Sequence, residues 1–452
     1  MIEKIIQNTE KYQEEHKKAE RKSKGQFFTS EYLAKKMAGF IHCEKDHLRI
    51  LEPGAGNGLL AAAVVQYATE NNLCRYFSIC YVEKDPDVIP LLRETVRILE
   101  AYARKHEIQI QTEIREEDFL GCCFSEHYDV LICNPPYKKA KKEEVMEFLP
   151  NDAKGQPNLY GLFLVKSTML LEEQGQLIFL TPRSWASGTY YQFVRSRVIQ
   201  DLNLKYLLVL QSRSNHFGTE DILQEVMITV AEKSERQDEY ITILDDAGGQ
   251  IRAEAKMILG DTILIPSNPG ELEVLKKMRN YPETFDSMGY RFRTGPVVEF
   301  RNQNDLRKDP GADTVPLIRM EHITKEGLRY PLPISKPQYL RKEASSLLIP
   351  MQKTVLVRRF SSKEESKRLQ SCIYEGTCPF ISIENHVNYL SHKDGKPLSK
   401  KEILWAQSIL ESEDYELYMR MYSGNTQIGA NDLNRLPIAF EVCREVLTLR
   451  SM

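Results

Sequence analysis

The segment RILEPGAGNG, residues 49–58, decides the fold of this chain. Its apolar beginning is typical of a buried strand end, and the apolar run at residues 59–67 is typical of a helix that follows. A strand joined to a helix by a glycine-rich turn is a building unit of open α/β sheets, and its glycines let a ligand approach the backbone closely. The segment therefore predicts an α/β fold with a ligand site where this strand ends.

Glu52 indicates which kind of ligand this site accepts. The loop after it has the spacing GxGxG and lacks the third glycine of the GxGxxG dinucleotide fingerprint. A carboxylate beside the loop repels a pyrophosphate but attracts a cationic group, such as the amino group of a methionine moiety. These two features argue against a nicotinamide-dependent dehydrogenase.

Three later strands place polar side chains at the same edge of the predicted sheet. The apolar run before Glu83 is the second strand, Asp118 and Phe119 follow the third, and Asn134 follows the fourth. Because ligands in open α/β sheets bind outside the carboxyl ends of the strands, we expect these side chains to converge. Glu83 is placed to accept hydrogen bonds from both hydroxyls of a ribose. Asp118 can accept one from an adenine amino group while Phe119 lies against the ring.

The residues after the fourth strand, Asn134, Pro135, Pro136 and Tyr137, form a stiff extended turn. Proline lacks an N–H and has a fixed φ, so the strand ladder stops here. The Asn134 amide oxygen and a backbone carbonyl can accept hydrogen bonds from an exocyclic amine, and the Tyr137 ring can stack on its plane. Taken alone, the tetrapeptide is equally consistent with a purely structural turn. Its place at the fourth strand end favours the binding interpretation.

The sequence divides into three parts. Residues 1–22 are highly charged and predict an N-terminal helix, and residues 23–245 carry the α/β pattern. The break PSNPG at residues 266–270 and the irregular pattern around it place a boundary near residues 245–270, so we expect residues 246–452 to form a second domain with short strands and many turns. In this domain Arg358 and Arg359 stand beside Phe360, a combination that suits phosphate and base-edge contacts, although a solvated surface is nearly as consistent with it.

Composition excludes several classes of protein. The 452 residues are 42% hydrophobic and 28% charged, which is typical of a soluble globular protein, and no apolar run reaches the roughly 18 residues of a membrane span. The net charge of −3 means that any nucleic-acid-binding surface must be local. The nine scattered cysteines form no CxxC pair, so we expect reduced thiols in the cytoplasm and no metal site.

The motifs together resemble those of S-adenosylmethionine-dependent DNA amino-methyltransferases of the gamma group. The matching segments occur in the family's order, and the catalytic part is similar to TaqI-type adenine methyltransferases. Three C-terminal segments resemble restriction-modification methylases of the BsuBI/PstI type. The first set comprises residues 24–29, 52–58, 83, 118–119 and 134–137, and the C-terminal set comprises residues 357–364, 383–386 and 423–428.

This resemblance implies a fold, an activity and a set of residue roles. The fold is a Rossmann-like methyltransferase domain with a mixed seven-stranded sheet, followed by a mixed α+β target-recognition domain. The activity is methyl transfer from S-adenosyl-L-methionine to N6 of an adenine flipped out of double-stranded DNA. The implied roles are Thr29, Glu52, Ala55 and Gly56 for the methionine part of the cofactor, Glu83 for its ribose, Asp118 and Phe119 for its adenine, Asn134 and the Pro135 carbonyl for the target N6, Tyr137 and Phe217 for the two faces of the flipped base, and Arg358 and Arg359 for DNA.

We expect a cytoplasmic enzyme, with any cognate restriction endonuclease a separate protein. The sequence leaves the oligomeric state open, and we favour a monomer. Three alternatives stay open: methylation of adenine in RNA, methylation of a glutamine side chain in a protein, and a non-catalytic DNA-binding subunit. Enzymes that methylate glutamine also use Asn-Pro-Pro-Tyr, but residues 24–29 and the long C-terminal part argue against that class. A fused nuclease is not expected, because no nuclease motif is evident and few residues precede the first motif.

Overall fold

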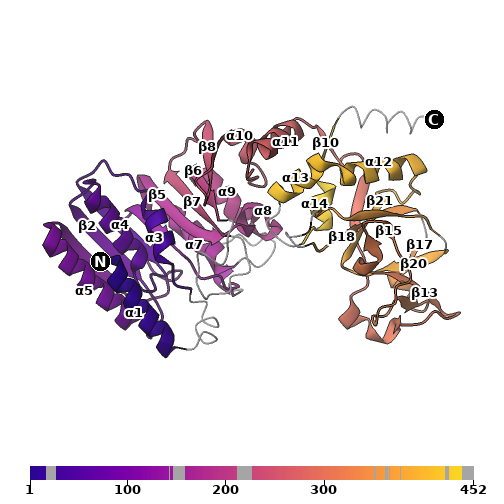
Figure 1. Ribbon diagram of the computed structural model, residues 1–452, viewed down its shortest axis with the longest axis horizontal. Helices are drawn as coiled ribbons and strands as arrows, with labels where there is room; N and C mark the ends of the chain where they lie inside the picture. Colours follow the sequence, from indigo (N-terminus) through magenta and orange to yellow (C-terminus); the bar gives the residue numbers. More distant parts are fainter. Residues whose placement is uncertain are drawn as a thin grey trace. The chain divides into compact units, whose positions relative to one another are not determined.

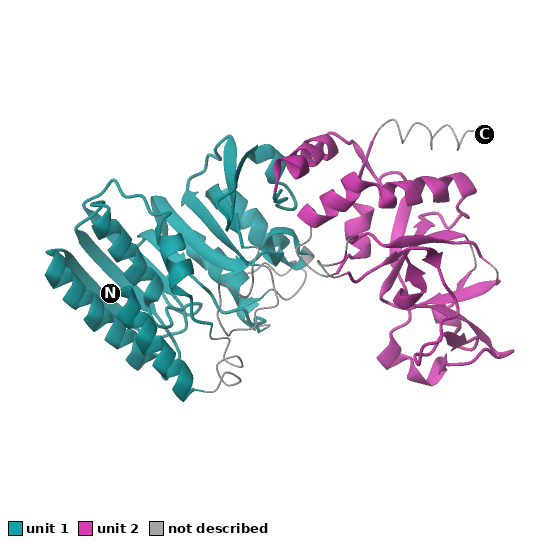
Figure 2. Cartoon of the chain, in the orientation of Figure 1, with its two compact units in different colours: residues 1–267 teal, residues 268–452 magenta. Residues whose placement is uncertain are grey.

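The computed structural model describes residues 1–16, 27–141, 143–145, 158–210, 226–350, 353–361, 365, 367–376, 378–422 and 427–439. The chain forms two compact units, Met1–Ser267 and Asn268–Met452 (Figure 2). The first unit contains the N-terminal helix and the α/β sheet, and the described part of the second contains short strands and the helices α11 to α14 (Figure 1).

A nine-stranded mixed sheet forms the centre of the first unit, with the order β3-β2-β1-β4-β5-β7-β6-β8-β9. The strands β3, β2, β1, β4 and β5 run parallel, and β7 lies antiparallel between β5 and β6. This arrangement is the Rossmann-like methyltransferase sheet that the sequence predicts. The seven strands are β1 (His47–Pro53), β2 (Tyr76–Val82), β3 (Gln109–Arg115), β4 (Tyr128–Cys133), β5 (Leu171–Pro182), β6 (Leu202–Val209) and β7 (Val226–Lys233).

Two further strands extend this sheet beyond the expected seven. Strand β8 (Tyr240–Asp245) pairs with β6 in parallel, and β9 (Gln250–Glu254) pairs with β8 antiparallel. The boundary between the units follows Ser267, which lies in the expected range of residues 245–270 and within the PSNPG segment. Strand β9 precedes this boundary because it pairs with β8. Residues 246–267 belong to the first unit for the same reason.

Helices cover both faces of the sheet. Along the central strands, every second side chain points to one face of the sheet. Ile50, Val130 and Ile178 point to the face covered by helices α1, α3, α4 and α5, with which they form a buried apolar cluster. The residues between them, such as Leu51, Leu131 and Leu177, are fully buried on the opposite face, where α7 contacts β5 and α9 contacts β6. The helices are α1 (Ile2–Glu15), α3 (Glu31–Ala38), α4 (Leu59–Glu70), α5 (Ile89–His106), α7 (Leu159–Met169), α8 (Ser184–Ser187), α9 (Gln192–Asp201) and α10 (Ala255–Ile258).

Helix α1 is an integral part of the first unit. Ile2 and Ile5 are buried in the main apolar cluster, and the helix contacts α3, α4 and α5. The Thr9 hydroxyl accepts a hydrogen bond from Asn57 Nδ2 at 2.8 Å, and Asn57 belongs to the glycine-rich loop. The helix that the sequence predicts within residues 1–22 is therefore present as α1, and it packs as part of the first unit.

The second unit has the mixed α+β character that the sequence predicts. Its larger sheets have the orders β12-β16-β13-β20-β17 and β11-β21-β18-β19. Among the described residues, no helix in either unit combines the length and apolar character needed to cross a bilayer. The elements are α11 (Pro269–Arg279), β10 (Glu283–Thr284), β11 (Tyr290–Thr294), β12 (Leu306–Arg307), β13 (Thr314–Ile318), β14 (Ile323–Thr324), β15 (Gly327–Leu328), β16 (Tyr339–Arg341), β17 (Ile349–Pro350), β18 (Thr354–Arg358), β19 (Ser371–Tyr374), β20 (Phe380–Ile383), β21 (Val387–His392), α12 (Lys400–Glu411), α13 (Glu413–Tyr422), α14 (Ala430–Asn434) and β22 (Pro437–Ile438).

Candidate functional site

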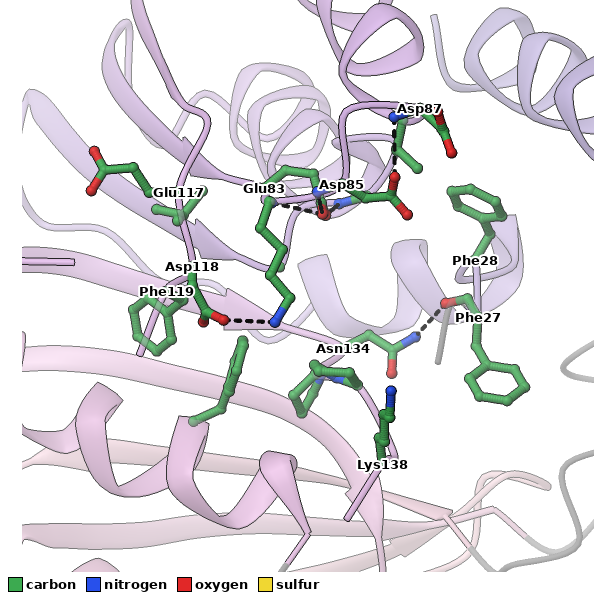
Figure 3. Close-up of a pocket in the computed structure, with 18 of the residues that line it drawn as sticks. Phe27, Phe28, Glu83, Asp85, Asp87, Glu117, Asp118, Phe119, Asn134 and Lys138 are labelled. Carbon is green, nitrogen blue, oxygen red and sulfur yellow. Dashed lines mark hydrogen bonds and ion pairs between the residues drawn. The ribbon is translucent and has the colours of Figure 1, made fainter. Parts of the chain in front are cut away.

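A cavity of about 490 Å³ lies where β1, β2 and β4 end, within the first unit (Figure 3). Since these strands are parallel neighbours, the loops that follow them meet at one edge of the sheet. The cavity wall is formed by Phe27, Phe28, Gly54, Gly56, Val82, Glu83, Lys84, Asp85, Pro86, Asp87, Val88, Glu117, Asp118, Phe119, Asn134, Pro135, Pro136, Lys138 and Phe163. The sequence-predicted residues Gly56, Glu83, Asp118, Phe119, Asn134, Pro135 and Pro136 are thus brought together.

The glycine-rich loop brings its backbone close to the cavity. Gly54 and Gly58 have φ values of +62° and +71°, a region that other residues rarely adopt. A Cβ on Gly58 would lie 2.6 Å from Leu92 Cδ1 of helix α5, so a larger residue here would require that side chain to shift. The Ala55 N–H donates to the Val82 carbonyl at 3.0 Å, which ties the loop to the end of β2.

Glu52 lies beneath this loop, where it is 2% exposed. Its carboxylate accepts hydrogen bonds from the backbone N–H groups of Leu60 at 3.3 Å and Ala61 at 2.8 Å, at the start of α4. Burial raises the pKa of Glu52 to about 8, even though these two donors favour the charged form. Among the described residues, Glu52 and Ala55 do not belong to the cavity wall. Glu52 thus fixes the first turn of α4, and this geometry does not favour the direct cofactor contact expected for it.

Glu83 is held rigidly at the end of β2. One carboxylate oxygen accepts from the N–H groups of Lys84 and Asp85, both at 2.8 Å, and the other accepts from the Gly56 N–H at 2.8 Å. Burial raises the pKa of Glu83, and these three donors oppose the shift. The result is a fixed acceptor on the cavity wall that joins the second strand to the glycine-rich loop.

Asp118 and Phe119 form another part of the wall. The Asp118 carboxylate accepts from the Leu120 N–H at 3.1 Å and pairs with Lys84 Nζ at 2.6 Å (Figure 3). The Phe119 ring is 2% exposed and packs against Phe163, with the ring centres 4.8 Å apart. At this part of the wall, a carboxylate that can accept hydrogen bonds therefore lies beside an apolar aromatic surface.

Asn134 has an unusual set of hydrogen bonds. Its Nδ2 donates to the Phe27 carbonyl at 3.2 Å (Figure 3). It also donates to Thr29 Oγ1 at 3.1 Å. Because a carbonyl can only accept, this contact determines which end of the amide is the nitrogen. The other end, Oδ1, is buried and has no hydrogen-bond partner among the described residues. A buried acceptor without a partner is costly, so a donor from a ligand would be strongly favoured here.

Three further residues of this unit were predicted to belong to the site, namely Thr29, Tyr137 and Phe217. Thr29 is 7% exposed, and its hydroxyl accepts from the Asn134 amide at the base of the site. The Tyr137 hydroxyl donates to the Leu180 carbonyl at 3.2 Å, and its ring centre lies 6.0 Å from that of Phe27 at an interplanar angle of 28°. Phe217 lies outside the described residues, as do residues 24–26 of the first motif.

Sequence reasoning did not assign Phe28, Lys84 or Phe163, although all three line the cavity. Phe28 stands beside Thr29 in the first motif, so its position was a usable signal. Lys84 follows Glu83, but its contact with Asp118 joins residues 34 positions apart. Phe163 lies on α7, which is buried all around, so no periodic pattern distinguishes it.

The cavity wall carries five carboxylates and two lysines, and aromatic rings line it as well. Such a site suits a ligand with a positive charge, hydroxyl and amino donors, and a planar ring. No group of three or more His, Cys, Asp or Glu side chains with metal-site geometry occurs in the described part of the chain. The chemistry of the site is that of hydrogen-bond acceptors.

In the second unit, the structure brings together segments far apart in the sequence. The Arg359 N–H donates to the His386 carbonyl at 2.8 Å, and the Ile428 N–H donates to the Arg359 carbonyl at 2.7 Å. The Arg359 guanidinium donates to the Asn385 carbonyl at 3.0 Å, and Arg358 donates to the Gln370 side chain. Both arginines therefore hold loops of this unit together, and their contact with DNA stays a prediction.

Comparison with known proteins gives strong similarities over most of the chain. The chain is 30% identical to the type II methyltransferase M.PstI of Providencia stuartii over 440 residues, which are 91% of this chain and 86% of that protein. It is 28% identical to the type II methyltransferase M.BsuBI of Bacillus subtilis over 441 residues, 91% and 87% of the two chains. The family model for the Eco57I restriction-modification methylase matches residues 80–217.

One solved structure resembles the chain over almost its full length. It is the type IIL restriction-modification enzyme MmeI in complex with DNA, with a TM-score of 0.51 and 11% sequence identity. The match covers 97% of this chain and 65% of that one. At this identity the similarity concerns the fold alone.

Proposed function

Because the chain belongs to the family of type II methyltransferases of restriction-modification systems that includes M.PstI and M.BsuBI, we propose that it methylates N6 of adenine in double-stranded DNA. The methyl donor in this proposal is S-adenosyl-L-methionine. The observation that carries the choice of an amino group as acceptor is Asn134 Oδ1, which is buried at the cavity with no partner among the residues that the structure describes.

The residues of the cavity fit the proposed cofactor. Glu83 is a preformed acceptor for the two ribose hydroxyls, and Asp118 and Phe119 suit an adenine edge and face. The excess of carboxylates suits a sulfonium cation, and a volume of about 490 Å³ suits a ligand of nucleoside size. When bound, the cofactor supplies an activated methyl group on sulfur.

The part of Asn134 in the reaction follows from its orientation. An adenine amine is a poor nucleophile because its lone pair is delocalised into the ring. The Asn134 oxygen and the Pro135 carbonyl accept hydrogen bonds from its two hydrogens, which favours a pyramidal nitrogen with a localised lone pair. Asn134 is then an acceptor that shapes the amine. The nitrogen would bond to the methyl carbon as the carbon–sulfur bond breaks, which would leave S-adenosylhomocysteine, and the methylated amine would then lose a proton to water. Positioning supplies much of the acceleration.

Tyr137 provides the surface for the target base. A base within a duplex cannot reach this cavity, so it must be extruded, which costs a few kcal/mol of lost pairing and stacking. Stacking on an aromatic ring returns roughly 1–3 kcal/mol per base. The Tyr137 hydroxyl is anchored on Leu180, so the ring is held in place before the base arrives. Phe217 is proposed to cover the opposite face.

The geometry modifies the roles proposed for the methionine end of the cofactor. Glu52 binds the start of α4 and the Ala55 N–H ties the glycine-rich loop to β2, so the Gly56 backbone at the cavity wall is the proposed contact. Thr29 orients Asn134 and thereby connects the first motif to the target amine. The second unit, with Arg358 and Arg359, is proposed to recognise the DNA sequence. We place the enzyme in the cytoplasm as a monomer, with any cognate endonuclease a separate protein.

The test is methylation of DNA by the purified protein, followed by nucleoside mass spectrometry. We expect N6-methyladenine, and single-molecule sequencing of DNA from expressing cells should locate it at one short sequence. Asn134→Ala should lower kcat by at least about 100-fold, as loss of one preorganised transition-state contact does, while binding of S-adenosylhomocysteine persists. Thr29→Val should lower kcat in the same direction, because it removes one of the two groups that hold the amide.

Asn71→Ala is the matched control, since Asn71 is an exposed asparagine whose side chain donates to the Tyr67 carbonyl at the end of α4. Its activity should equal that of the unmodified protein. Methylated cytosine in place of adenine would refute the target base, and methylation of RNA or of a protein glutamine with inert DNA would refute the substrate. An Asn134→Ala variant with near-normal turnover would refute the catalytic centre.

A further inference from the structure

Lys166 is a buried lysine on α7 that the proposed reaction does not use. Its side chain is 8% exposed, and Nζ donates to the carbonyl oxygens of Leu120 at 2.9 Å and Cys122 at 2.6 Å. The same nitrogen lies 5.1 Å from the centre of the Phe119 ring and 5.5 Å from that of Phe124. Burial of an ammonium group is costly unless it is hydrogen-bonded, and here two carbonyls and two aromatic faces provide the compensation.

These contacts fix the turn that carries Asp118 and Phe119. The turn satisfies its own N–H groups, because the N–H groups of Gly121 and Cys122 both donate to the Asp118 carbonyl at 3.0 Å. Its outward carbonyls, those of Leu120 and Cys122, are the ones that Lys166 holds. Without this lysine, two carbonyl groups of the turn would lose a charged donor.

Helix α7 also contributes Phe163 to the cavity wall, one turn before Lys166. Phe163 packs against Phe119 with ring centres 4.8 Å apart. The helix therefore touches the cavity directly through an aromatic ring and indirectly through the lysine. Both α7 residues contact the Phe119 ring, and Lys166 also binds the carbonyls of the turn that follows it.

We propose that Lys166 is a positioning residue for the adenine end of the cofactor, a role that rests on the proposed function and deepens it. It sets the distance between the acceptor edge of Asp118 and the aromatic surface of Phe119 and Phe163. The Asp118 side chain binds correctly only when the carbonyls behind it are anchored. Lys166 acts through the turn and does not touch the cofactor.

Lys166→Met tests this role, because methionine is unbranched and apolar and cannot bind the two carbonyls. The KM for S-adenosylmethionine should rise about 10-fold or more, the effect of losing hydrogen bonds to a charged group, while kcat at saturating cofactor and the KM for DNA stay within about twofold. The dissociation constants of S-adenosylhomocysteine and 5′-methylthioadenosine should rise together, since both carry the adenine ring. Lys166→Arg, which keeps donors at this place, should restore most of the affinity.

Lys233→Met is the matched control. Lys233 Nζ also donates to a carbonyl of α7, that of Thr168, at 3.0 Å, but this carbonyl is remote in sequence from the 118–122 turn. Its KM for the cofactor should be unchanged. If Lys166→Met does not fold, Lys166→Leu takes its place, because leucine also has no donor for the two carbonyls, and a raised KM is again expected.

An unchanged KM for the cofactor in a folded Lys166→Met or Lys166→Leu protein would overturn the inference. So would a loss of affinity in Lys233→Met equal to that in Lys166→Met, because the effect would then belong to the stability of the helix. The unmodified protein separates this result from failure of the proposed function. If it binds neither S-adenosylhomocysteine nor methylthioadenosine, the proposed cofactor is wrong, whereas equal binding by the unmodified and variant proteins refutes only the role of Lys166.

Discussion

Glu52 places an ionisable group in the interior of the first unit, under the glycine-rich loop. Its pKa is raised from an ordinary value of 4.5 to about 8 by burial, so the folded protein holds a proton that the unfolded chain releases at neutral pH. The folded state binds more protons between these two values. The stabilising effect of that proton is complete below pH 4.5 and is lost as the pH rises through about 8.

We therefore expect the free energy of unfolding of the first unit to fall between pH 5 and pH 8, by up to about 1.4 kcal/mol per pH unit from this group. Glu52→Gln should remove that part of the slope, because an amide does not titrate. Urea unfolding at several pH values measures how the free energy of unfolding changes with pH. Glu70→Gln, at an exposed position near the other end of α4, is the control and should keep the slope of the unmodified protein. A slope that persists in Glu52→Gln would contradict the assignment.

At the scale of elements, α1 illustrates how packing decides what belongs to a domain. Ile5 is fully buried among helices of the first unit, whereas its neighbour Ile6 is only partly buried. Tyr12 of the same helix lies edge-on to Phe28, which lines the cavity, with ring centres 5.8 Å apart. The helix is thus part of the structure behind the site.

Ile5→Ala should lower the free energy of unfolding of the first unit by about 2–4 kcal/mol, because it leaves a cavity in a closed core. Ile6→Ala should have a clearly smaller effect, and the comparison of the two in chemical denaturation is the measurement. Equal effects would mean that α1 packs loosely. In that case α1 would be a solvated helix, as the highly charged sequence of residues 1–22 would indicate.

The elements show which parts of this protein could be predicted from its sequence. The strands that end at Glu83 and Asn134 were predictable because apolar runs, glycines and prolines act locally along the chain. Strands β8 and β9 were not assigned to the sheet because their place depends on pairing with β6. Lys84 and Lys166 were missed because their partners lie 34 and more positions away. Local sequence patterns therefore predict where the site lies, whereas the contacts that complete it join residues distant in the sequence and could not be predicted.

At the scale of the whole molecule, the chain has two tryptophans, and each unit contains one of them. Trp185 is fully buried in the first unit, and Trp405 is 9% exposed in the second. A protein with Trp405→Phe therefore reports unfolding of the first unit alone, and one with Trp185→Phe reports the second. The described wall of the cofactor cavity comes entirely from the first unit.

S-adenosylhomocysteine should therefore stabilise the transition that Trp185 reports. At a concentration of 100 times its dissociation constant the expected gain is about 2.7 kcal/mol. The transition that Trp405 reports should not move. Fluorescence-detected urea unfolding, with and without the ligand, measures both. A shift of the same size in both transitions would mean that the two units unfold as one body.

The contact between Asn134 and Phe27 has a consequence for how relatives are compared. The group that orients the amide is the main-chain oxygen of residue 27, which is present whatever side chain the codon specifies. A change of that codon can leave the contact intact, and an alignment column that varies freely can still carry an essential atom. In families of this kind, letters in aligned sequences record side chains only. Positions whose contribution comes from the peptide group must be found in coordinates.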